Sequence, residues 1–435
     1  MQGSVFGSPH SVWSSNKMEK DVFPAHASAL QKSKLDLPLA DFIKSTAAAI
    51  ALLGTRIDEA GGDLEMDLVD WVSTAVFSGA MDAMFGGEFL GISDESTTAA
   101  FRSNFVKFDQ AFPLLASDMI PSVLLRFIPP LSAGIKARND LALQFEQWVI
   151  RGMPGLEEGV IKEMVNVGLK SGWSTRVHIL PNASATVHLQ VSLPNQKANA
   201  PHAALWSLLY ILQSPILPSV LSEISTIKSS SLSLPVLSTS LPILSSCLHE
   251  TIRLATSSFS IRVVEEDFFL ASNTPSSLDE KSDAKAAVPK REGWVVPAGS
   301  RIICATRVPH LDTNHWGKDA EEWDGTRFVD REGEGNERSK RAREVRGFGG
   351  GISICEGRHL ATAELQAFLV QVLSAFDITI ASEQQDLASA SKIKIFGSKD
   401  GVAPKLAEGR VGMGVRQFSV GSSVKVRVCR RQLEV

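Results

Sequence analysis

The chain has 435 residues, of which 44% are hydrophobic and 21% are charged, and this globular composition excludes wholesale disorder. Its net charge of −4 at pH 7 argues against a protein that binds nucleic acid through bulk positive charge. The four cysteines include no C-x-x-C pair, which excludes a disulfide framework and a cysteine-rich zinc site. Such cysteine usage is typical of a reducing compartment.

No targeting segment is recognisable in the sequence. The first 23 residues lack the apolar core of a signal peptide. The apolar run 46–53 is shorter than the stretch of about 20 residues that crosses a bilayer. The run 203–221 has nearly that length but carries Gln213, Pro215 and Pro218. We therefore expect a buried helix that ends at the prolines, rather than a membrane span.

The first 170 residues are predicted to be helical. The run 67–85 is strongly apolar and closes at Gly86–Gly87, which is a typical helix stop. Between residues 99 and 112, four phenylalanines recur at spacings of four, three and four residues, so this helix is expected to face the core. A third helix is predicted at 136–149. Residues 171–198 are polar, β-leaning and interrupted by proline, and they fit no clear element.

The rest of the chain is predicted to combine helices with short strands. We expect a Ser/Leu-rich segment at 222–246, a helix from about 244, strands at 259–264 and 301–305, a charged loop at 272–293, a charged coil at 332–347, a helix at 358–376 and a strand at 424–428. No internal repeat is visible. The fold class is therefore mainly α with a minor β part.

The most informative stretch is GFGGGISICEGRHLA, residues 347–361. Three consecutive glycines precede Cys355, Gly357 follows it, and a helix is predicted to begin directly afterwards. A glycine-rich loop lets the backbone approach a flat cofactor, and N–H groups at a helix N-terminus lower the pKa of a thiol. The pattern therefore suits an axial metal ligand, although Cys355 alone would also fit a buried structural cysteine. No GK(S/T) or complete G-x-G-x-x-G supports a phosphate loop.

This stretch resembles the heme-binding signature of the cytochromes P-450, F-x-x-G-x-(R/H)-x-C-x-G. Phe348, Gly351, Cys355 and Gly357 match the signature, and Ala361 matches the small residue that usually follows it. The sequence departs from the pattern at Ser353, where the family has an Arg or His that contacts a heme propionate.

Three further segments resemble the same family and occur in its order. Glu250 and Arg253 match the E-x-x-R helix motif, and Arg327 matches the arginine of the P-E-R-F segment within WDGTRF, residues 323–328. Arg262 and Asp267 resemble the next strand of the family, whose arginine normally contacts a propionate. These matches imply a structural triad of Glu250, Arg253 and Arg327.

The resemblance implies heme b as the cofactor, with Cys355 as the axial iron ligand and Phe348, Gly351, Gly357 and Arg262 as further cofactor-binding residues. It implies a single domain, 1–435, with the cytochrome P-450 fold. A helical distal part is expected at about 1–224, and a heme-binding part at about 244–435. We also expect an N-terminally incomplete member, or a gene-model artefact, because the family's anchor, part of its β domain and its W-x-x-x-R segment are not recognisable.

The distal side lacks the acid–alcohol pair of most monooxygenases in this family. Asn199, Pro201 and Trp206 resemble, at tighter spacing, the N-x-x-P-x-x-x-W pattern of the subgroup that contains sterol 7α-hydroxylases and prostacyclin synthase. The segments 105–116 and 410–418 also resemble this subgroup. The richness in serine and proline and the CEGRHLA loop resemble fungal members of the family. Asn199 is the candidate catalytic residue near the iron-bound ligand, whereas His202 is expected to pack or face solvent rather than bind iron.

Three functions remain open at this point. The first is a heme-thiolate monooxygenase that oxidises a lipophilic, steroid- or terpenoid-like molecule with dioxygen and electrons from an NADPH-cytochrome reductase. The second is a heme-thiolate isomerase or dehydratase that needs no reductase, and the third is a truncated, catalytically silent homologue. The family usually resides on the endoplasmic reticulum membrane facing the cytosol, but no anchor is recognisable here, so a cytosolic or peripheral location also stays open.

The segment 338–346 carries five basic residues against one acid, Glu344. One interpretation is a solvated loop. The other is a docking surface for an acidic reductase domain, because the segment directly precedes the cysteine loop.

Overall fold

The computed structural model describes residues 20, 23–89, 95–117, 120–125, 127–170, 199–227, 231–271, 293–333, 335–351, 354–381, 413–418 and 422–432. The N-terminal stretch, the segment 171–198, the charged loop at 272–292 and Ser353 lie outside these residues, so the expectations placed on them stay untested.

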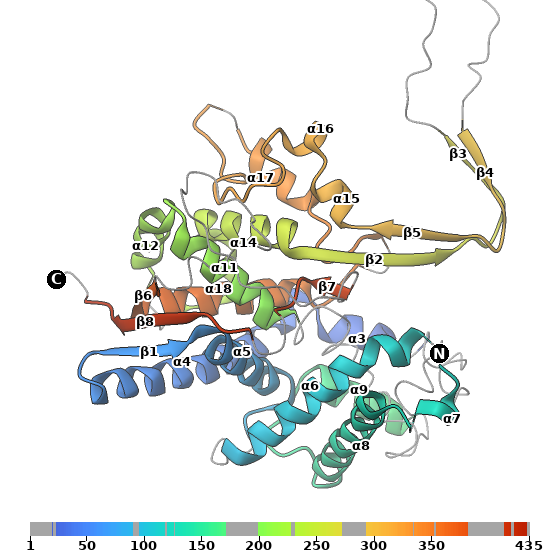
Figure 1. Cartoon of the computed structure of the whole chain (residues 1–435), viewed down its shortest axis with the longest axis horizontal. Helices are drawn as coiled ribbons and strands as arrows, with labels where there is room; N and C mark the ends of the chain where they lie inside the picture. The colour runs from blue at the N-terminus through green and yellow to red at the C-terminus, as the bar shows by residue number, and fades with distance from the viewer. Residues whose placement is uncertain are drawn as a thin grey trace, which may run out of the picture.

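The described residues are mainly helical, as the sequence predicts (Figure 1). The helices are α3 (Phe23–Ala29), α4 (Asp36–Glu59), α5 (Leu68–Phe85), α6 (Glu95–Ser117), α7 (Ser122–Leu125), α8 (Pro129–Ile150), α9 (Val160–Lys170), α11 (Ala200–Gln213), α12 (Leu217–Ser225), α13 (Leu234–Thr239), α14 (Pro242–Ala255), α15 (Arg307–His310), α16 (Thr313–Trp316), α17 (Glu337–Arg341) and α18 (Arg358–Ala375). The strands are β1 (Asp63–Asp67), β2 (Thr256–Val263), β3 (Phe268–Ala271), β4 (Gly293–Val296), β5 (Arg301–Ala305), β6 (Phe376–Ile380), β7 (Met413–Val415) and β8 (Lys425–Arg430).

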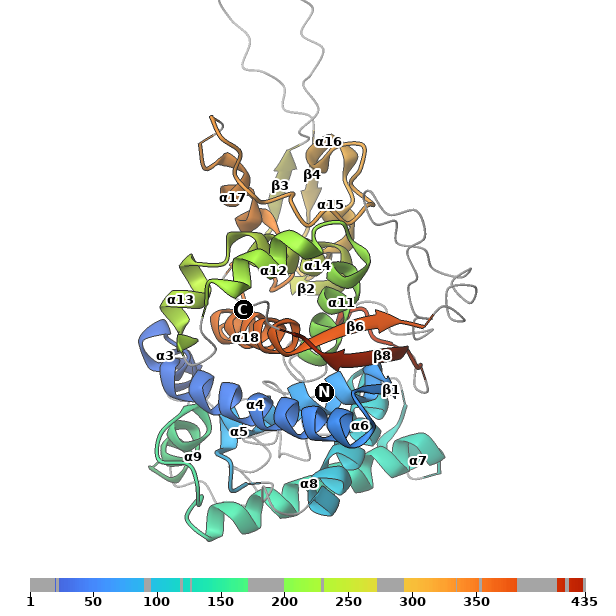
Figure 2. The same cartoon turned by 90° about the vertical axis from the view of Figure 1, so that its left-hand side faces the viewer.

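Helices α11, α14 and α18 form the centre of the molecule, and α4 and α5 pack beneath them (Figure 2). Helices α6 and α8 pair on the far side of α5, and the short helices α15 to α17 lie at the opposite end. One continuous hydrophobic cluster, from Ala29 to Val428, connects the central helices to α4, α5, α6 and α8, whereas Trp316, Ala320 and Phe328 form a small separate cluster near the short helices. The cysteine loop therefore begins α18, one of the most deeply buried helices of the chain.

Helix α11 confirms the expected buried helix. Its sequence is apolar on all sides, as suits a helix enclosed by other elements, and Ala200 to Ile211 are buried with the exception of His202. The helix ends at Gln213, just before Pro215, and α12 continues at an angle of 110° to it. Proline lacks the N–H that a continuing helix needs, so the break follows directly from the sequence.

The strands form three small antiparallel sheets, in the orders β1–β8–β6, β5–β2–β7 and β3–β4. The sequence did not predict β1, whose residues DLEMD are mostly acidic. It pairs with β8 near the other end of the chain, from Asp63 opposite Cys429 to Asp67 opposite Lys425. Such a long-range pairing leaves no local signal in the sequence.

Three predicted boundaries are wrong in detail. Strand β2 begins at Thr256, three residues before the predicted start. The Ser/Leu-rich segment contains the end of α12 and the whole of α13. The charged coil at 332–347 contains α17 and a 3₁₀ turn at Ala342–Glu344. Short polar helices show only a weak hydrophobic periodicity in the sequence, so their formation depends on tertiary contacts.

Helix α4 is long and apolar enough to cross a membrane by length and composition. It is longer than the apolar run 46–53 because the helix extends through polar residues on both sides. Its most apolar window is 28% buried, and α4 packs against α5 and α18. One such helix is weak evidence for a membrane span, since core helices of other proteins meet the same criteria.

Candidate functional site

The cysteine loop holds Cys355 just before the first turn of α18, with Gly357 as the residue that caps the helix. The backbone N–H of Cys355 donates to the carbonyl of Phe348 at 2.9 Å, which closes the loop. Gly349 and Gly351 have φ angles of +78° and +66°, a conformation that other residues adopt only with strain. A side chain added at Gly351 would meet no atom within 4 Å, so the backbone is open on that side.

The electrostatics of Cys355 differ from the sequence-based expectation. Burial raises the pKa of its thiol to about 11, and the backbone N–H of Gly357 and the positive charge of Arg358 only partly oppose this effect. Removal from water disfavours the thiolate, because the thiolate is the charged form. This effect outweighs the stabilisation of the thiolate by the N-terminus of the helix. The thiolate would therefore form when a metal cation coordinates the sulfur, since a coordinating thiol loses its proton.

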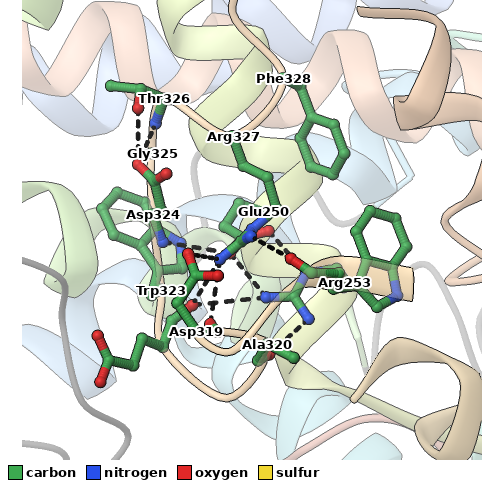
Figure 3. A network of polar contacts seen from close by, with 12 residues as sticks. Glu250, Arg253, Asp319, Ala320, Trp323, Asp324, Gly325, Thr326, Arg327 and Phe328 are labelled. Atoms are coloured by element: carbon green, nitrogen blue, oxygen red, sulfur yellow. Dashed lines mark hydrogen bonds and ion pairs between the residues drawn. The ribbon is translucent and has the colours of Figure 1, made fainter. Parts of the chain in front are cut away.

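The predicted triad is present and buried (Figure 3). Glu250 accepts from Arg253 at 2.7 and 2.8 Å and from Arg327 Nε at 2.8 Å, and the side chain of Glu250 is completely buried. Its Oε1 also accepts the backbone N–H of Asp324 at 3.2 Å. Arg327 pairs in addition with Asp319 at 3.0 Å. The α14 carboxylate thus fixes the segment that contains WDGTRF.

The triad is also hydrogen-bonded to other segments of the backbone. Arg253 donates to the carbonyls of His310 and of Ala320, the latter at 2.7 Å. The imidazole Nε2 of His310 accepts the backbone N–H of Arg346 at 2.8 Å, at the start of the cysteine loop. A chain of hydrogen bonds therefore runs from α14 through His310 to the cysteine loop. The role of the triad is structural, because none of these groups reaches Cys355 itself.

His310 is a site residue that sequence reasoning missed. It is 1% exposed, and burial followed by the charge of Arg253 lowers its pKa to about 4, so it is neutral near pH 7. No sequence signal could have found it, because its two contacts join residues 57 and 36 positions apart in the chain.

The predicted propionate contact, Arg262, lies on β2 with an exposed side chain. Its Nη1 donates to the carbonyl of Ile261 at 3.0 Å. Asp267 accepts the backbone N–H of Ala298 at 2.7 Å, which holds the turn between the strands. The role of Arg262 in cofactor binding remains a prediction.

The distal candidate Asn199 is 1% exposed and precedes the first residue of α11. Its Oδ1 accepts the backbone N–H of Val415 at 2.6 Å, so this amide connects α11 to β7. Trp206 donates from Nε1 to the carbonyl of Arg416 at 2.8 Å. His202 accepts the N–H of Phe418 at 3.4 Å and packs against its ring, which agrees with the expected packing role.

The donor set fits a heme rather than a bare metal ion. Within the described part of the chain, no group of three or more His, Cys, Asp or Glu side chains could hold a metal ion. A single half-buried cysteine on a glycine-rich loop can supply one axial thiolate, as a heme iron needs. Phe348, Gly351 and Gly357 form the loop around that sulfur, so they would lie against the cofactor.

Comparison with known proteins agrees with this arrangement. The family model for Cytochrome P450 matches residues 289–400, which include the cysteine loop. Cytochrome P450 7A1 of Rattus norvegicus is 25% identical over 79% of this chain, and the chain spans 64% of the length of that relative. The 25-hydroxycholesterol 7-alpha-hydroxylase of the same species is 26% identical over 76% of this chain and 78% of its own length. The Cholesterol 7-alpha-monooxygenase of Cricetulus griseus is 24% identical over 79% of this chain and 64% of its own length.

The relatives match more than three quarters of the chain, and they include the sterol 7α-hydroxylases that the distal segment resembles. Two of the sequence motifs, E-x-x-R and WDGTRF, meet in the buried Glu250–Arg253–Arg327 network. On these grounds the chain is similar to the cytochrome P450 family, both in the segment that the family model matches and along most of its length.

Proposed function

We propose that the protein is a heme-thiolate monooxygenase that oxidises a lipophilic molecule with dioxygen and electrons from a reductase. The observation that carries this proposal is the geometry of Cys355, a half-buried thiol on a loop closed by its own backbone hydrogen bond at the start of α18. A heme held there would activate dioxygen, and a thiolate ligand favours cleavage of its O–O bond.

The protein's own residues would orient and protect this chemistry. Helix α11 presents an almost entirely buried surface that excludes water from its surroundings. Asn199 at its start would position the oxygen-containing ligand. Its amide can donate and accept hydrogen bonds but cannot deliver a proton as a carboxylic acid does. The proton would then come from water or from a hydroxyl group of the substrate.

The substrate class follows from the relatives. Two of the similar proteins are named for oxidation of cholesterol or 25-hydroxycholesterol at position 7. A steroid- or terpenoid-like substrate is therefore the first choice for this chain.

The electron donor would dock on the face formed by α17 and the following turn. This segment carries Arg338, Lys340, Arg341, Arg343 and Arg346. Arg343 and Arg346 are exposed, whereas Arg341 lies over the ring of Trp316 and donates to the carbonyl of His315. Exposed positive charge would attract an acidic flavin domain of an NADPH-cytochrome reductase.

Purified protein loaded with heme b tests the proposal. The reduced, CO-bound spectrum reports thiolate ligation. Turnover of cholesterol and 25-hydroxycholesterol is then followed with NADPH, reductase and dioxygen. A hydroxylated product that requires all three supports the proposal. Product formed from a lipid hydroperoxide without reductase would instead identify an isomerase or dehydratase. A protein that binds no heme would be a silent homologue.

A further inference from the structure

Gly347, at the start of the cysteine loop, lies against α14 with no room for a side chain. A Cβ added to this glycine would lie 2.0 Å from Cγ2 of Ile252 and 3.2 Å from Oγ1 of Thr256, whereas ordinary van der Waals contacts begin at 3.4 Å. The φ angle of Gly347 is not positive, so the backbone conformation alone would allow an alanine. The lack of space, rather than the backbone conformation, therefore requires glycine at this position.

The α14 side of this contact cannot easily yield. Ile252 is 4% exposed, and Thr256, which directly follows the last residue of α14, is fully buried. Cγ2 of Ile252 is bonded directly to Cβ, and a β-branched side chain in a helix has essentially one preferred χ1 rotamer. The methyl group could therefore move away only if α14 moved, and the buried ion pair of Glu250 with Arg327 connects that helix to the WDGTRF segment.

The cysteine loop is hydrogen-bonded immediately before and after Gly347. The N–H of Arg346 donates to Nε2 of His310 at 2.8 Å. The carbonyl of Phe348 accepts the N–H of Cys355 at 2.9 Å. One residue and one hydrogen bond thus separate Gly347 from Cys355, so a displacement of the glycine would also displace the cysteine.

We propose that Gly347 is a positioning residue for Cys355. Its missing side chain lets the loop lie directly on Ile252, and this contact sets the distance between the loop and α14. To relieve the contact of 2.0 Å, the loop of an alanine variant would have to move by about 1.4 Å. A functional side chain must be held to within about 0.5 Å of its productive position. The inference rests on the proposed function, because Cys355 needs such a position as the ligand of a heme iron.

Gly347→Ala tests the contact, with Gly350→Ala as the matched control. Gly350 lies in the same loop without a positive φ angle, and a Cβ there would meet only Cδ of Arg346, at 3.7 Å. The heme-binding signature accepts any residue at this position. We expect Gly347→Ala to lower the affinity of the apoprotein for heme b about 10- to 100-fold and to weaken the thiolate-type CO spectrum. Gly350→Ala should change neither, and unchanged values in Gly347→Ala would overturn the proposal.

Substitutions at Ile252 identify the cause of the effect. Ile252→Ala removes Cγ2 and keeps Cβ, which lies 3.5 Å from the added atom and makes an ordinary contact. Ile252→Val keeps Cγ2. Combined with Gly347→Ala, Ile252→Ala should therefore restore the heme affinity to that of Ile252→Ala alone, whereas Ile252→Val should not. Equal heme affinities of the two double variants would mean that another effect of Gly347→Ala is responsible, and the proposal would fail.

A heme-free measurement separates positioning from a loss of stability. In the apoprotein, alkylation of Cys355 by iodoacetamide is followed by peptide mass spectrometry well below the melting temperature. A displaced loop should expose the half-buried thiol and raise the alkylation rate several-fold in Gly347→Ala, but not in Gly350→Ala. A lower melting temperature with an unchanged alkylation rate and CO spectrum would make the contact ordinary packing and would refute the positioning role.

If Gly347→Ala alone does not fold, Gly347→Ala and Gly347→Val are compared in the Ile252→Ala protein. The larger side chain should again displace the loop and lower the heme affinity, and equal affinities would contradict the proposal. Failure of the proposed function is a different outcome. It would appear as absence of a thiolate-type CO spectrum in the unsubstituted protein, while the alkylation rates would still report whether Gly347 sets the position of the loop.

Discussion

The imidazole of His310 accepts a hydrogen bond from the backbone N–H of Arg346, and the carbonyl of the same histidine accepts from Arg253. One buried residue therefore connects the ion-pair network of α14 to the start of the cysteine loop. The hydrogen bond from Arg346 to His310 stabilises the cysteine loop, in addition to the bond between Cys355 and Phe348 that closes it.

This connection predicts a pH-dependent contribution of His310. Its pKa of about 4 in the folded protein lies below the usual 6.5, so the unfolded chain binds the proton more strongly. The contribution of neutral His310 to the free energy of unfolding is therefore fully present above about pH 6.5. It decreases as the pH is lowered towards 4, by up to roughly 3 kcal/mol. Urea unfolding of the apoprotein at several pH values measures this loss.

His310→Gln and His310→Leu separate the two roles of this residue. Neither titrates, so both should lack this part of the acid sensitivity. Glutamine can still accept the N–H of Arg346, and it should retain the thiolate-type CO spectrum better than leucine, which cannot. Equal spectra for the two variants would show that the hydrogen bond does not position the loop.

Cys355 is expected to be the only cysteine that ligates heme iron. Cys355→Ser should abolish the thiolate-type CO spectrum. Cys304 is exposed on β5, and Cys247 is buried with its Sγ 3.7 Å from the carbonyl of Gly325, so neither has a comparable loop. Alanine at Cys247, Cys304 or Cys429 should leave heme content unchanged. Loss of heme in Cys304→Ala, with retention in Cys355→Ser, would refute the assignment.

Glu250→Gln should destabilise the protein by about 3–5 kcal/mol, because it leaves the buried guanidinium of Arg253 without a counter-charge and Arg327 with Asp319 as its remaining partner. Denaturant unfolding of the apoprotein measures the change. Glu163→Gln is the control, since its ion pair with Lys34 is exposed and is expected to contribute less than about 1 kcal/mol. Similar losses in both variants would contradict the structural role of the triad.

Charge reversal on the reductase-facing surface should slow electron transfer. Arg343→Glu with Arg346→Glu is the better pair, because Arg341 also packs on Trp316 and would disturb the fold. Stopped-flow reduction at low salt is expected to be slower, with heme content unchanged, and the difference should shrink at high salt. Identical rates at low salt would leave this segment as an ordinary solvated surface.

Asn199 combines a structural contact with its proposed catalytic role. Asn199→Leu loses the acceptor for the Val415 N–H and should cost about 1–3 kcal/mol. Asn199→Asp keeps an acceptor oxygen and should fold normally, while replacing the amide nitrogen that would contact the ligand. Lower turnover in Asn199→Asp with an unchanged melting temperature supports the catalytic role. Full activity of that variant would restrict Asn199 to holding β7.

The sequence alone determined the elements that depend on local patterns. The break of α11 at Pro215, the start of α18 after Gly357 and the strand β5 follow from proline, glycine and β-branched residues. The motif residues Cys355, Glu250, Arg253 and Arg327 were also identified because the family uses them at fixed spacings. Their identity therefore needed no coordinates.

Tertiary structure decided everything that depends on distant residues. The acidic strand β1 exists only because β8 lies beside it, some 360 positions later in the chain. The high pKa of the Cys355 thiol comes from burial, which a helix N-terminus in the sequence cannot reveal. The two hydrogen bonds of His310 likewise join residues that lie 57 and 36 positions apart in the chain. Spatial proximity, and not sequence spacing, creates such sites, because desolvation and charge act across the folded interior.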